Sequence, residues 1–281
     1  MRTSKHRHAR LATHGLVAVI IALQFLGGCG QDDNAPARTG NESPAPTPLP
    51  RGADPVELDP DDFTAGSDHP YFPLEPGRQW TFRETDESGA TVNVVVTVSN
   101  QTRTIANGVE ARVVRDTVTE DGALIEDTLD WYAQDTDGNV WYLGENTAEF
   151  VDGELTTRDG SFEAGVDGAL PGIIMPADPA VGMKYRQEYY KDEAEDNGEV
   201  IATGHQADVA KGHFDDVVLT SDTITIEPEV LEYKLYAPGV GLVMALGISG
   251  GGGREELVST RTVSEGTAEA AGTAPLGTPY G

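Results

Sequence analysis

The stretch from Val109 to Phe150 decides the fold, and it reads VEARVVRDTVTEDGALIEDTLDWYAQDTDGNVWYLGENTAEF. Runs rich in Val, Thr, Trp and Tyr alternate here with Asp121-Gly122 and Asp137-Gly138. An Asp-Gly pair between such runs is the strongest short-range signal for a β-hairpin. The stretch therefore predicts three consecutive antiparallel strands joined by two turns.

Similar turn signals occur at Ser88-Gly89, Asn107-Gly108 and Asp152-Gly153. The glycines of successive turns are only 14 to 19 residues apart, which leaves no room for the helical crossovers that parallel strands need. The sequence thus predicts a mainly β protein with a single antiparallel meander sheet. We expect the sheet to be curved into a half-barrel or open barrel, with long irregular loops.

A two-residue turn at Asp137-Gly138 would assign the side chains of its two strands to opposite faces. One face then holds Trp131, Ala133, Val140 and Tyr142, and the other holds Tyr132, Trp141 and Leu143. A sheet that is apolar on both faces must be covered on both sides or curled around something. The same logic at Asp121-Gly122 sets Asp116 opposite Asp127. Because like charges across a ladder are unfavourable, either the register is shifted or this edge is well solvated.

The first 28 residues have the pattern of an export signal. Four basic residues (Arg2, Lys5, Arg7 and Arg10) precede an apolar run from Leu16 to Leu26. This run is too short to span a bilayer, so residues 1–28 are predicted to be a signal peptide. The segment ends in Leu26-Gly27-Gly28-Cys29, and Cys29 is the only cysteine of the chain.

This ending resembles the lipobox of bacterial lipoproteins, in which a dedicated peptidase cuts just before the cysteine. The resemblance implies that Cys29 becomes the mature N-terminus and carries acyl chains such as palmitate, which makes the membrane a partner. Each buried methylene contributes about 0.8 kcal/mol, so two or three chains anchor stably. The expected location is the cell envelope, outside the cytoplasm. Gly30 implies the outer membrane in a two-membrane bacterium, and otherwise the outer face of the cytoplasmic membrane.

The net charge excludes nucleic acids as expected partners. The formal charge is −28, and removal of the four basic residues of the leader would change it to −32. Such a surface repels DNA, RNA and anionic lipid headgroups. It suits a body held away from the membrane or one in contact with cations.

Composition divides the rest of the chain into three parts. Residues 29–69 are rich in Pro and poor in apolar residues, which predicts a disordered tether. Residues 70–263 are predicted to form the β-rich domain, and residues 264–281, with Gly, Thr, Ala and Pro, a disordered tail. Within the domain, residues 159–182 are predicted to be a long irregular excursion, because their apolar residues lie between prolines and glycines.

That excursion suggests a lid over an apolar ligand pocket. The residues predicted to line such a pocket are Leu170, Ile173, Ile174, Met175, Trp131 and Trp141. The alternative is that these aromatic and aliphatic side chains belong to the core.

Two groups of residues raise the question of metal binding. Asp135, Asp137 and Asn139 place oxygen ligands on alternate residues beside Gly138, as part of a calcium loop does, although a hairpin turn explains the same pattern. His205 and His213 lie near Asp208, Asp215 and Asp216, and solvated loop histidines are the alternative there. No cofactor is expected apart from calcium at the first group.

No catalytic grouping can be named. The chain has no Gly-x-Ser-x-Gly elbow, no His-Glu-x-x-His and no phosphate-binding loop. We therefore expect that the protein is not an enzyme.

Two short segments resemble exported bacterial β-rich lipoproteins of the half-barrel kind: YFPLEPGRQW (Tyr71–Trp80) and LYAPGVGLV (Leu235–Val243). The resemblance implies a curved antiparallel sheet with an apolar concave face and carries no functional residue across. The expected function is a lipid-anchored cell-envelope binding or structural module, in its sharper form with an apolar ligand pocket. The alternative is a calcium-dependent surface protein that uses acidic loops, and an enzyme of unidentified type comes third. Whether the partner is a protein or an apolar small molecule stays open.

Overall fold

The computed structural model describes residues 48–86, 88–251 and 253–280. The elements in chain order are η1 (Pro60–Asp62), β1 (Phe63–Thr64), β2 (Arg78–Asp86), β3 (Thr91–Thr104), β4 (Glu110–Glu120), β5 (Ala123–Asp135), β6 (Val140–Val151), β7 (Glu154–Thr157), β8 (Phe162–Glu163), β9 (Leu170–Met175), β10 (Lys184–Arg186), β11 (Glu188–Tyr189), β12 (Asp196–Val209), β13 (Gly212–Ile224), β14 (Leu231–Ala237), β15 (Gly241–Ser249), β16 (Gly253–Thr262) and α1 (Glu265–Thr273). The expected mainly β architecture is confirmed. Within these ranges, no helix has the length and apolar character needed to cross a membrane.

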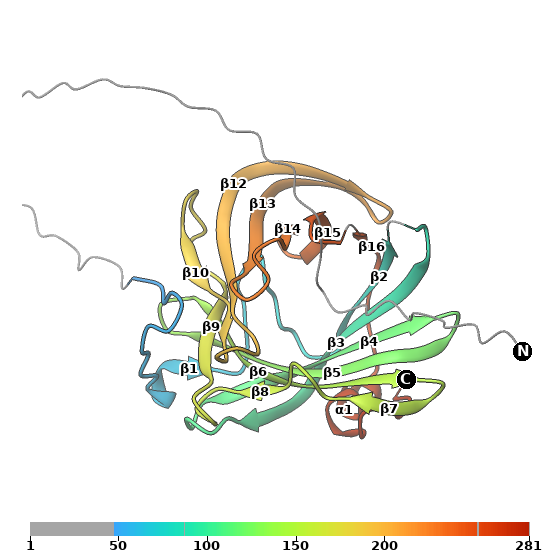
Figure 1. Cartoon of the computed structure of the whole chain (residues 1–281), viewed down its shortest axis with the longest axis horizontal. Coiled ribbons are helices and arrows are strands. Elements are labelled where there is room, and N and C mark those ends of the chain that lie inside the picture. Colours follow the sequence, from blue (N-terminus) through green and yellow to red (C-terminus); the bar gives the residue numbers. More distant parts are fainter. Residues whose placement is uncertain (1–47, 87, 252, 281) are drawn as a thin grey trace, which may run out of the picture.

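The strands form one antiparallel sheet that curls into a nearly closed barrel with one unsealed seam. The strand order is β10-β12-β13-β14-β15-β16-β2-β3-β4-β5-β6-β9-β11. In Figure 1, β3 to β6 form the lower wall and β12 to β16 arch over it. β10 and β11 lie at opposite ends of the order, yet only Gln187 separates them in the chain. One short segment therefore connects the two edges of the sheet at the seam.

The predicted meander is confirmed, because β4, β5 and β6 are the three strands expected between Val109 and Phe150. Asp121 and Gly122 have φ angles of 49° and 83°. A two-residue type I′ hairpin turn requires positive φ at both central residues. Asp tolerates this conformation better than most residues, because its short polar side chain can hydrogen-bond locally.

The expected face assignment around Asp137-Gly138 is wrong by one position. The turn is longer than two residues, since the Asp135 N–H donates to the carbonyl oxygen of Asn139 (2.9 Å). Tyr132 consequently lies opposite Tyr142, with ring centroids 5.0 Å apart. The residues that pack together on the other face are Trp131, Ala133, Trp141 and Leu143.

The register between β4 and β5 is also shifted, which resolves the predicted charge conflict. An irregularity next to Val118 moves Asp116 opposite Thr128. Asp127 lies one position away on the other face, where it pairs with Arg115. The two aspartates therefore do not face each other.

The main hydrophobic core lies inside the curled sheet, because its members come from strands all around it. Phe82 on β2, Val94 on β3, Val243 on β15 and Leu257 on β16 are each at most 4% exposed. A second cluster contains Trp131 and the residues that share its face.

The prediction of a disordered tether through residue 69 is wrong from residue 48 onward. Apolar side chains of this segment pack against the second cluster: Leu49, Val56, Leu58 and Phe63. The fully buried Arg186 also donates hydrogen bonds to the carbonyl oxygens of Gly52 and Asp54. Residues 1–47, which hold the predicted signal peptide, Cys29 and the rest of the tether, lie outside the described residues.

The prediction of a disordered tail is likewise wrong for residues 264–280. Helix α1 begins after Ser264, whose hydroxyl accepts a hydrogen bond from the Thr267 N–H (3.1 Å), as an N-cap residue does. Two residues of this helix, Ala268 and Ala271, are buried. In Figure 1 this helix lies under the lower wall, on the side away from the arch.

Residues 159–182 are more regular than predicted. β8 and β9 both pair with β6, and β9 also pairs with β11. The backbone of this segment therefore extends the sheet next to the seam, and it is not a free loop. Gly172 is required there, because a Cβ atom at this position would lie 2.1 Å from the carbonyl oxygen of Gln187.

Candidate functional site

The six residues predicted to line an apolar pocket do not form one group. β9 belongs to the sheet, and a register irregularity opposite Val140 and Trp141 places Ile173 and Met175 in different clusters although they are only two positions apart. Ile173 packs with Trp131 and Trp141 in the second cluster, whereas Met175 packs in the main core inside the sheet. Ile174 is partly buried against the main core, and Leu170 is half-buried. A lid over a cavity is therefore not the arrangement that these residues adopt.

The suggested calcium loop is used as a turn. The Asp135 carboxylate accepts hydrogen bonds from the Asn139 N–H (2.7 Å), the Asn139 side-chain amide (2.9 Å) and the Trp141 indole (2.7 Å). The Asn139 side-chain oxygen accepts from the Ala177 N–H (3.0 Å). Asp137 lies exposed at the tip of the turn. These oxygens hold the turn together and dock it on the chain after β9.

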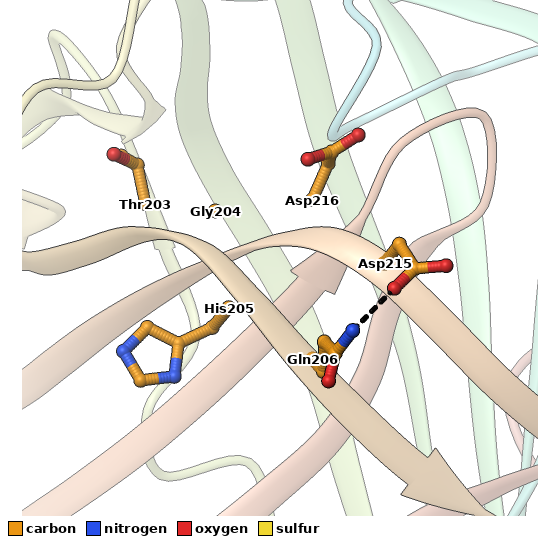
Figure 2. Close-up of a pocket in the computed structure, with 6 residues that line it drawn as sticks. All are labelled: Thr203, Gly204, His205, Gln206, Asp215 and Asp216. Carbon is orange, nitrogen blue, oxygen red and sulfur yellow. Dashed lines mark hydrogen bonds between the residues drawn. The ribbon is translucent and has the colours of Figure 1, made fainter.

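The histidines of β12 and β13 do not converge on a metal site. His213 lies between Asp208 (2.9 Å) and Asp215 (3.4 Å), and these carboxylates raise its pKa. Figure 2 shows the nearby hollow of about 460 Å³, where Gln206 donates to Asp215 (2.7 Å) and His205 turns to the side away from Asp216. Across the described ranges, no three His, Cys, Asp or Glu side chains are arranged to hold a metal ion.

The most unusual feature of the molecule is a set of acidic residues that lie opposite one another on neighbouring strands. Four pairs of acidic residues lie directly opposite each other on neighbouring strands: Glu126/Glu149, Asp130/Glu145, Glu84/Glu255 and Asp222/Glu232. Like charges in such positions normally destabilise a sheet. Asp116 faces the same side as the first two pairs, because it is opposite Thr128. We call these nine residues the acidic face.

The acidic face lies on the inside of the curled sheet. Glu84 lies two positions after the core residue Phe82, Asp116 two positions after Val114, and Glu255 two positions before Leu257. Residues two positions apart on a strand share a face, so these acids point inward with the main core. Carboxylates from distant strands accordingly help to raise one another's pKa: Glu255 contributes to that of Asp116, and Glu84 to that of Glu126. Most of them are only half-buried, so water reaches the face.

Two further acids extend this face toward the seam. Burial raises the pKa of Glu188 on β11 well above its usual value, and Asp196 on β12 and Glu145 on β6 add to this effect. The acidic face is thereby continuous with the segment that connects the two edges of the sheet.

Tyr142 contacts both carboxylates of the pair of Asp130 and Glu145. Its hydroxyl oxygen lies 2.9 Å from a carboxylate oxygen of Asp130 and 3.0 Å from one of Glu145. A tyrosine has a single hydroxyl proton, so it can donate to only one of them at a time. The pair of carboxylates is therefore left with unsatisfied negative charge whenever both are ionised.

The pKa values follow from this crowding. Burial, reinforced by neighbouring carboxylates, raises the pKa of Glu126 to about 7 and that of Glu255 to about 8. Burial also raises the pKa of Asp130 to about 7, against the opposing effect of the Tyr142 hydrogen bond. Burial and like charge raise the pKa of Asp116 and Glu145 well above the usual range. Burial inside the barrel thus disfavours the ionised form of these carboxyl groups, even though part of each side chain remains accessible.

One pair of the acidic face has a cation of its own. The Lys234 ammonium lies 2.8 Å from Asp222 and 3.1 Å from Glu232. Burial opposes its charge, but these two carboxylates outweigh burial and raise the pKa of Lys234 well above its ordinary value. In the part of the chain that the structure describes, none of the other seven residues of the acidic face takes part in an ion pair.

Sequence reasoning missed the acidic face, because acids are frequent throughout this chain. A signal was nevertheless present in β5. Glu126, Thr128 and Asp130 alternate with other residues and so share one face of a strand. The aromatic residues further along β5 led us to expect an apolar face here as well.

Comparison with known protein families gives no match, and comparison with curated proteins gives no relative. Among solved structures, a Bacteroides fragilis protein provisionally described as exported, with a YmcC-like fold, is 16% identical with a TM-score of 0.42. The match covers 68% of this chain and 99% of that one. A provisionally described lipoprotein of Parabacteroides distasonis is 13% identical with a TM-score of 0.38, covering 68% and 98%. Likenesses this distant do not assign a family.

Proposed function

We propose that the protein is a lipid-anchored, non-enzymatic binding module of the cell envelope and that its acidic face binds a cationic ligand. The observation that carries the proposal is the set of opposed carboxylate pairs inside the curled sheet, three of which have no cation between them in the described residues. A cation that neutralises such a pair removes like-charge repulsion and gains attraction from both carboxylates in surroundings of reduced dielectric.

The anchor part of the proposal is supported by the sequence Leu26-Gly27-Gly28-Cys29. Because residues 48–69 pack against the barrel, the tether available to separate the barrel from the lipid runs only from Cys29 to residue 47. A stretch this long spans up to about 60 Å when extended. This length sets the greatest distance between the barrel and the membrane surface.

An apolar ligand has less support. The concave face does contain apolar residues, but charged side chains lie beside them on the same strands: Glu84 beside Phe82, and Asp116 beside Val114. Burying these carboxylates under an apolar molecule without partners would cost free energy. A cationic ligand supplies the missing partners.

The proposal is tested by measuring the melting temperature of the purified full-length protein against calcium, magnesium and spermine, each at matched ionic strength. A ligand at 100 times its Kd should stabilise the folded state by about 2.7 kcal/mol, which corresponds to a rise of roughly 5 to 11 °C for a domain of this size.

The matched variants separate the acidic face from general surface charge. Asp130→Asn with Glu145→Gln should remove most of the stabilisation by cations. Glu120→Gln with Glu154→Gln, which changes two exposed acids, should leave it intact. The proposal fails if no cation stabilises the protein beyond the ionic-strength control, or if both double variants lose the effect equally.

A further inference from the structure

The contact between Lys234 and its two carboxylates shows what kind of cation this barrel holds. Asp222 and Glu232 lie opposite each other on β13 and β14. The Lys234 side chain places its ammonium between them, within 2.8 Å and 3.1 Å of one oxygen of each. A primary ammonium has three donors and suits two carboxylates on facing strands. This arrangement is an occupied ammonium site supplied by the chain itself.

Three other pairs have the same cross-strand geometry but no ammonium of their own. Glu126 is opposite Glu149, Asp130 is opposite Glu145, and Glu84 is opposite Glu255. The Cβ atoms of directly opposed residues lie roughly 5 Å apart, as in any antiparallel ladder. Each pair can therefore place an ammonium between its carboxylates as Asp222 and Glu232 do.

The spacing along the strands indicates a ligand with several charges. Asp130 lies four positions after Glu126 on β5, so the two pairs on β5 and β6 are roughly 13 Å apart. The row between them is polar, because the Thr128 and Thr147 hydroxyls lie 2.6 Å apart there. An extended polyamine such as spermine can span this distance with an amine in each pair.

Two buried polar atoms beside the acidic face have no hydrogen-bond partner in the described residues. One is the hydroxyl of Tyr185, which is 1% exposed. Burial, followed by the charge of Asp222, raises the pKa of this hydroxyl. The other is an inaccessible carboxylate oxygen of Asp116. Buried polar groups are normally satisfied, so atoms left in this way call for an explanation.

We propose that the protein binds a linear polyamine, whose ammonium groups occupy the carboxylate pairs of the acidic face as the Lys234 ammonium occupies the pair of Asp222 and Glu232. The inference rests on the proposed function and narrows it to one class of ligand. The aromatic rings of Tyr132 and Tyr142 stack next to the pair of Asp130 and Glu145. Tyr132 is partly exposed and offers apolar surface beside this pair to the methylene groups of the ligand.

A single divalent metal ion fits the same residues less well. Calcium and magnesium need several oxygen ligands converging on one point. In the ranges that the structure describes, the acids are distributed as separate pairs, and no three of them converge in that way. Negative charges spread over separate pairs favour a ligand with several separated positive charges over a single metal ion.

The first experiment is calorimetric titration of the full-length protein with spermine, with magnesium and calcium at matched ionic strength as comparison. Saturable spermine binding is expected, with affinity at least tenfold weaker in the Asp130→Asn/Glu145→Gln variant. The Glu120→Gln/Glu154→Gln variant should bind as the parent does. If calcium binds and spermine does not, the polyamine inference is overturned while the proposed function stands. If no cation binds, both are overturned.

The second experiment tests the ammonium site directly. Lys234→Ala removes the portion of the side chain that n-propylammonium reproduces, so n-propylamine should raise the melting temperature of this variant or restore its refolding. In the parent protein Lys234 fills this site, so the response to n-propylamine, through the other pairs alone, should be smaller than in Lys234→Ala. n-Propanol should have no effect on either protein. If n-propylamine does not rescue Lys234→Ala beyond n-propanol, the barrel does not hold ammonium groups between paired carboxylates, and the inference falls.

Discussion

Arg115→Met should destabilise the protein severely, because Arg115 joins the C-terminal segment to the sheet. The Arg115 side chain is fully buried and donates to Asp127 through Nε (2.7 Å) and Nη2. The same guanidinium donates to the carbonyl oxygens of Ala274 (2.7 Å) and Pro275 (3.2 Å). Gly277 completes the contact by donating its N–H to Asp127 (2.7 Å). One ion pair thus binds the segment mainly through its backbone.

The magnitude follows from the charge that the substitution leaves behind. Without Arg115, Asp127 keeps a negative charge in a site with no access to water, and breaking a buried pair in this way costs about 3–5 kcal/mol. For a domain of this size each kcal/mol lowers the melting temperature by about 2–4 °C. The expected decrease is therefore roughly 6 to 20 °C.

Urea unfolding of the parent, Arg115→Met, Asp127→Leu and the double variant provides the assay. The double variant should be much more stable than Arg115→Met, because it leaves no unpaired charge, and the cycle measures the coupling. Arg83→Met, which changes an exposed arginine on β2, is the control and should change the unfolding free energy by less than about 0.5 kcal/mol. A loss of under about 1 kcal/mol for Arg115→Met would refute the idea that this pair holds the segment.

Two further predictions concern pH and the anchor. The pKa values of Glu126 and Asp130 are raised to about 7 and that of Glu255 to about 8 in the folded state, so the folded protein binds more protons than the unfolded chain between about pH 4.5 and 8. Stability should fall as pH rises through that window, and a melting temperature that instead increases from pH 5 to 8 would contradict the shifts. Cys29→Ser should leave the protein unlipidated and unprocessed or released, as measured by fractionation and intact mass. A processed variant that fractionates with membranes as the parent does would contradict the lipoprotein prediction.

The local parts of the fold were predictable from the sequence, and the register was not. Asp121-Gly122 specifies its turn through the conformations those two residues prefer, whatever the rest of the chain does. The pairing beyond a turn depends on the length of the turn, as at Asp137-Gly138, and on bulges such as the one next to Val118. A shift of one residue moves every later side chain to the other face. This is why the hairpins were predicted correctly while Trp131 and Trp141 were assigned to the wrong partners.

The two terminal segments were missed for a different reason. Composition argues for disorder when a segment has too little apolar surface to bury, and residues 264–280 have little. They are held instead by Arg115, whose donors bind carbonyl oxygens that every residue type possesses. Arg186 binds the carbonyl oxygens of Gly52 and Asp54 in the N-terminal segment in the same way. Recognition of backbone by a distant arginine leaves no pattern in the segment that is recognised.

The acidic face shows why stability alone does not explain this sequence. Thr or Val at Glu126, Asp130, Glu149 or Glu255 would suit a β-strand better and would remove like-charge contacts. Arg115 and Asp127 show that the same sheet can pair a buried carboxylate within the chain. Lys234 shows that the concave face can do so as well. The absence of a cation between the remaining pairs is therefore a property of those pairs and not of the whole face. A sequence that departs locally from its most stable choice does so most often where it binds something.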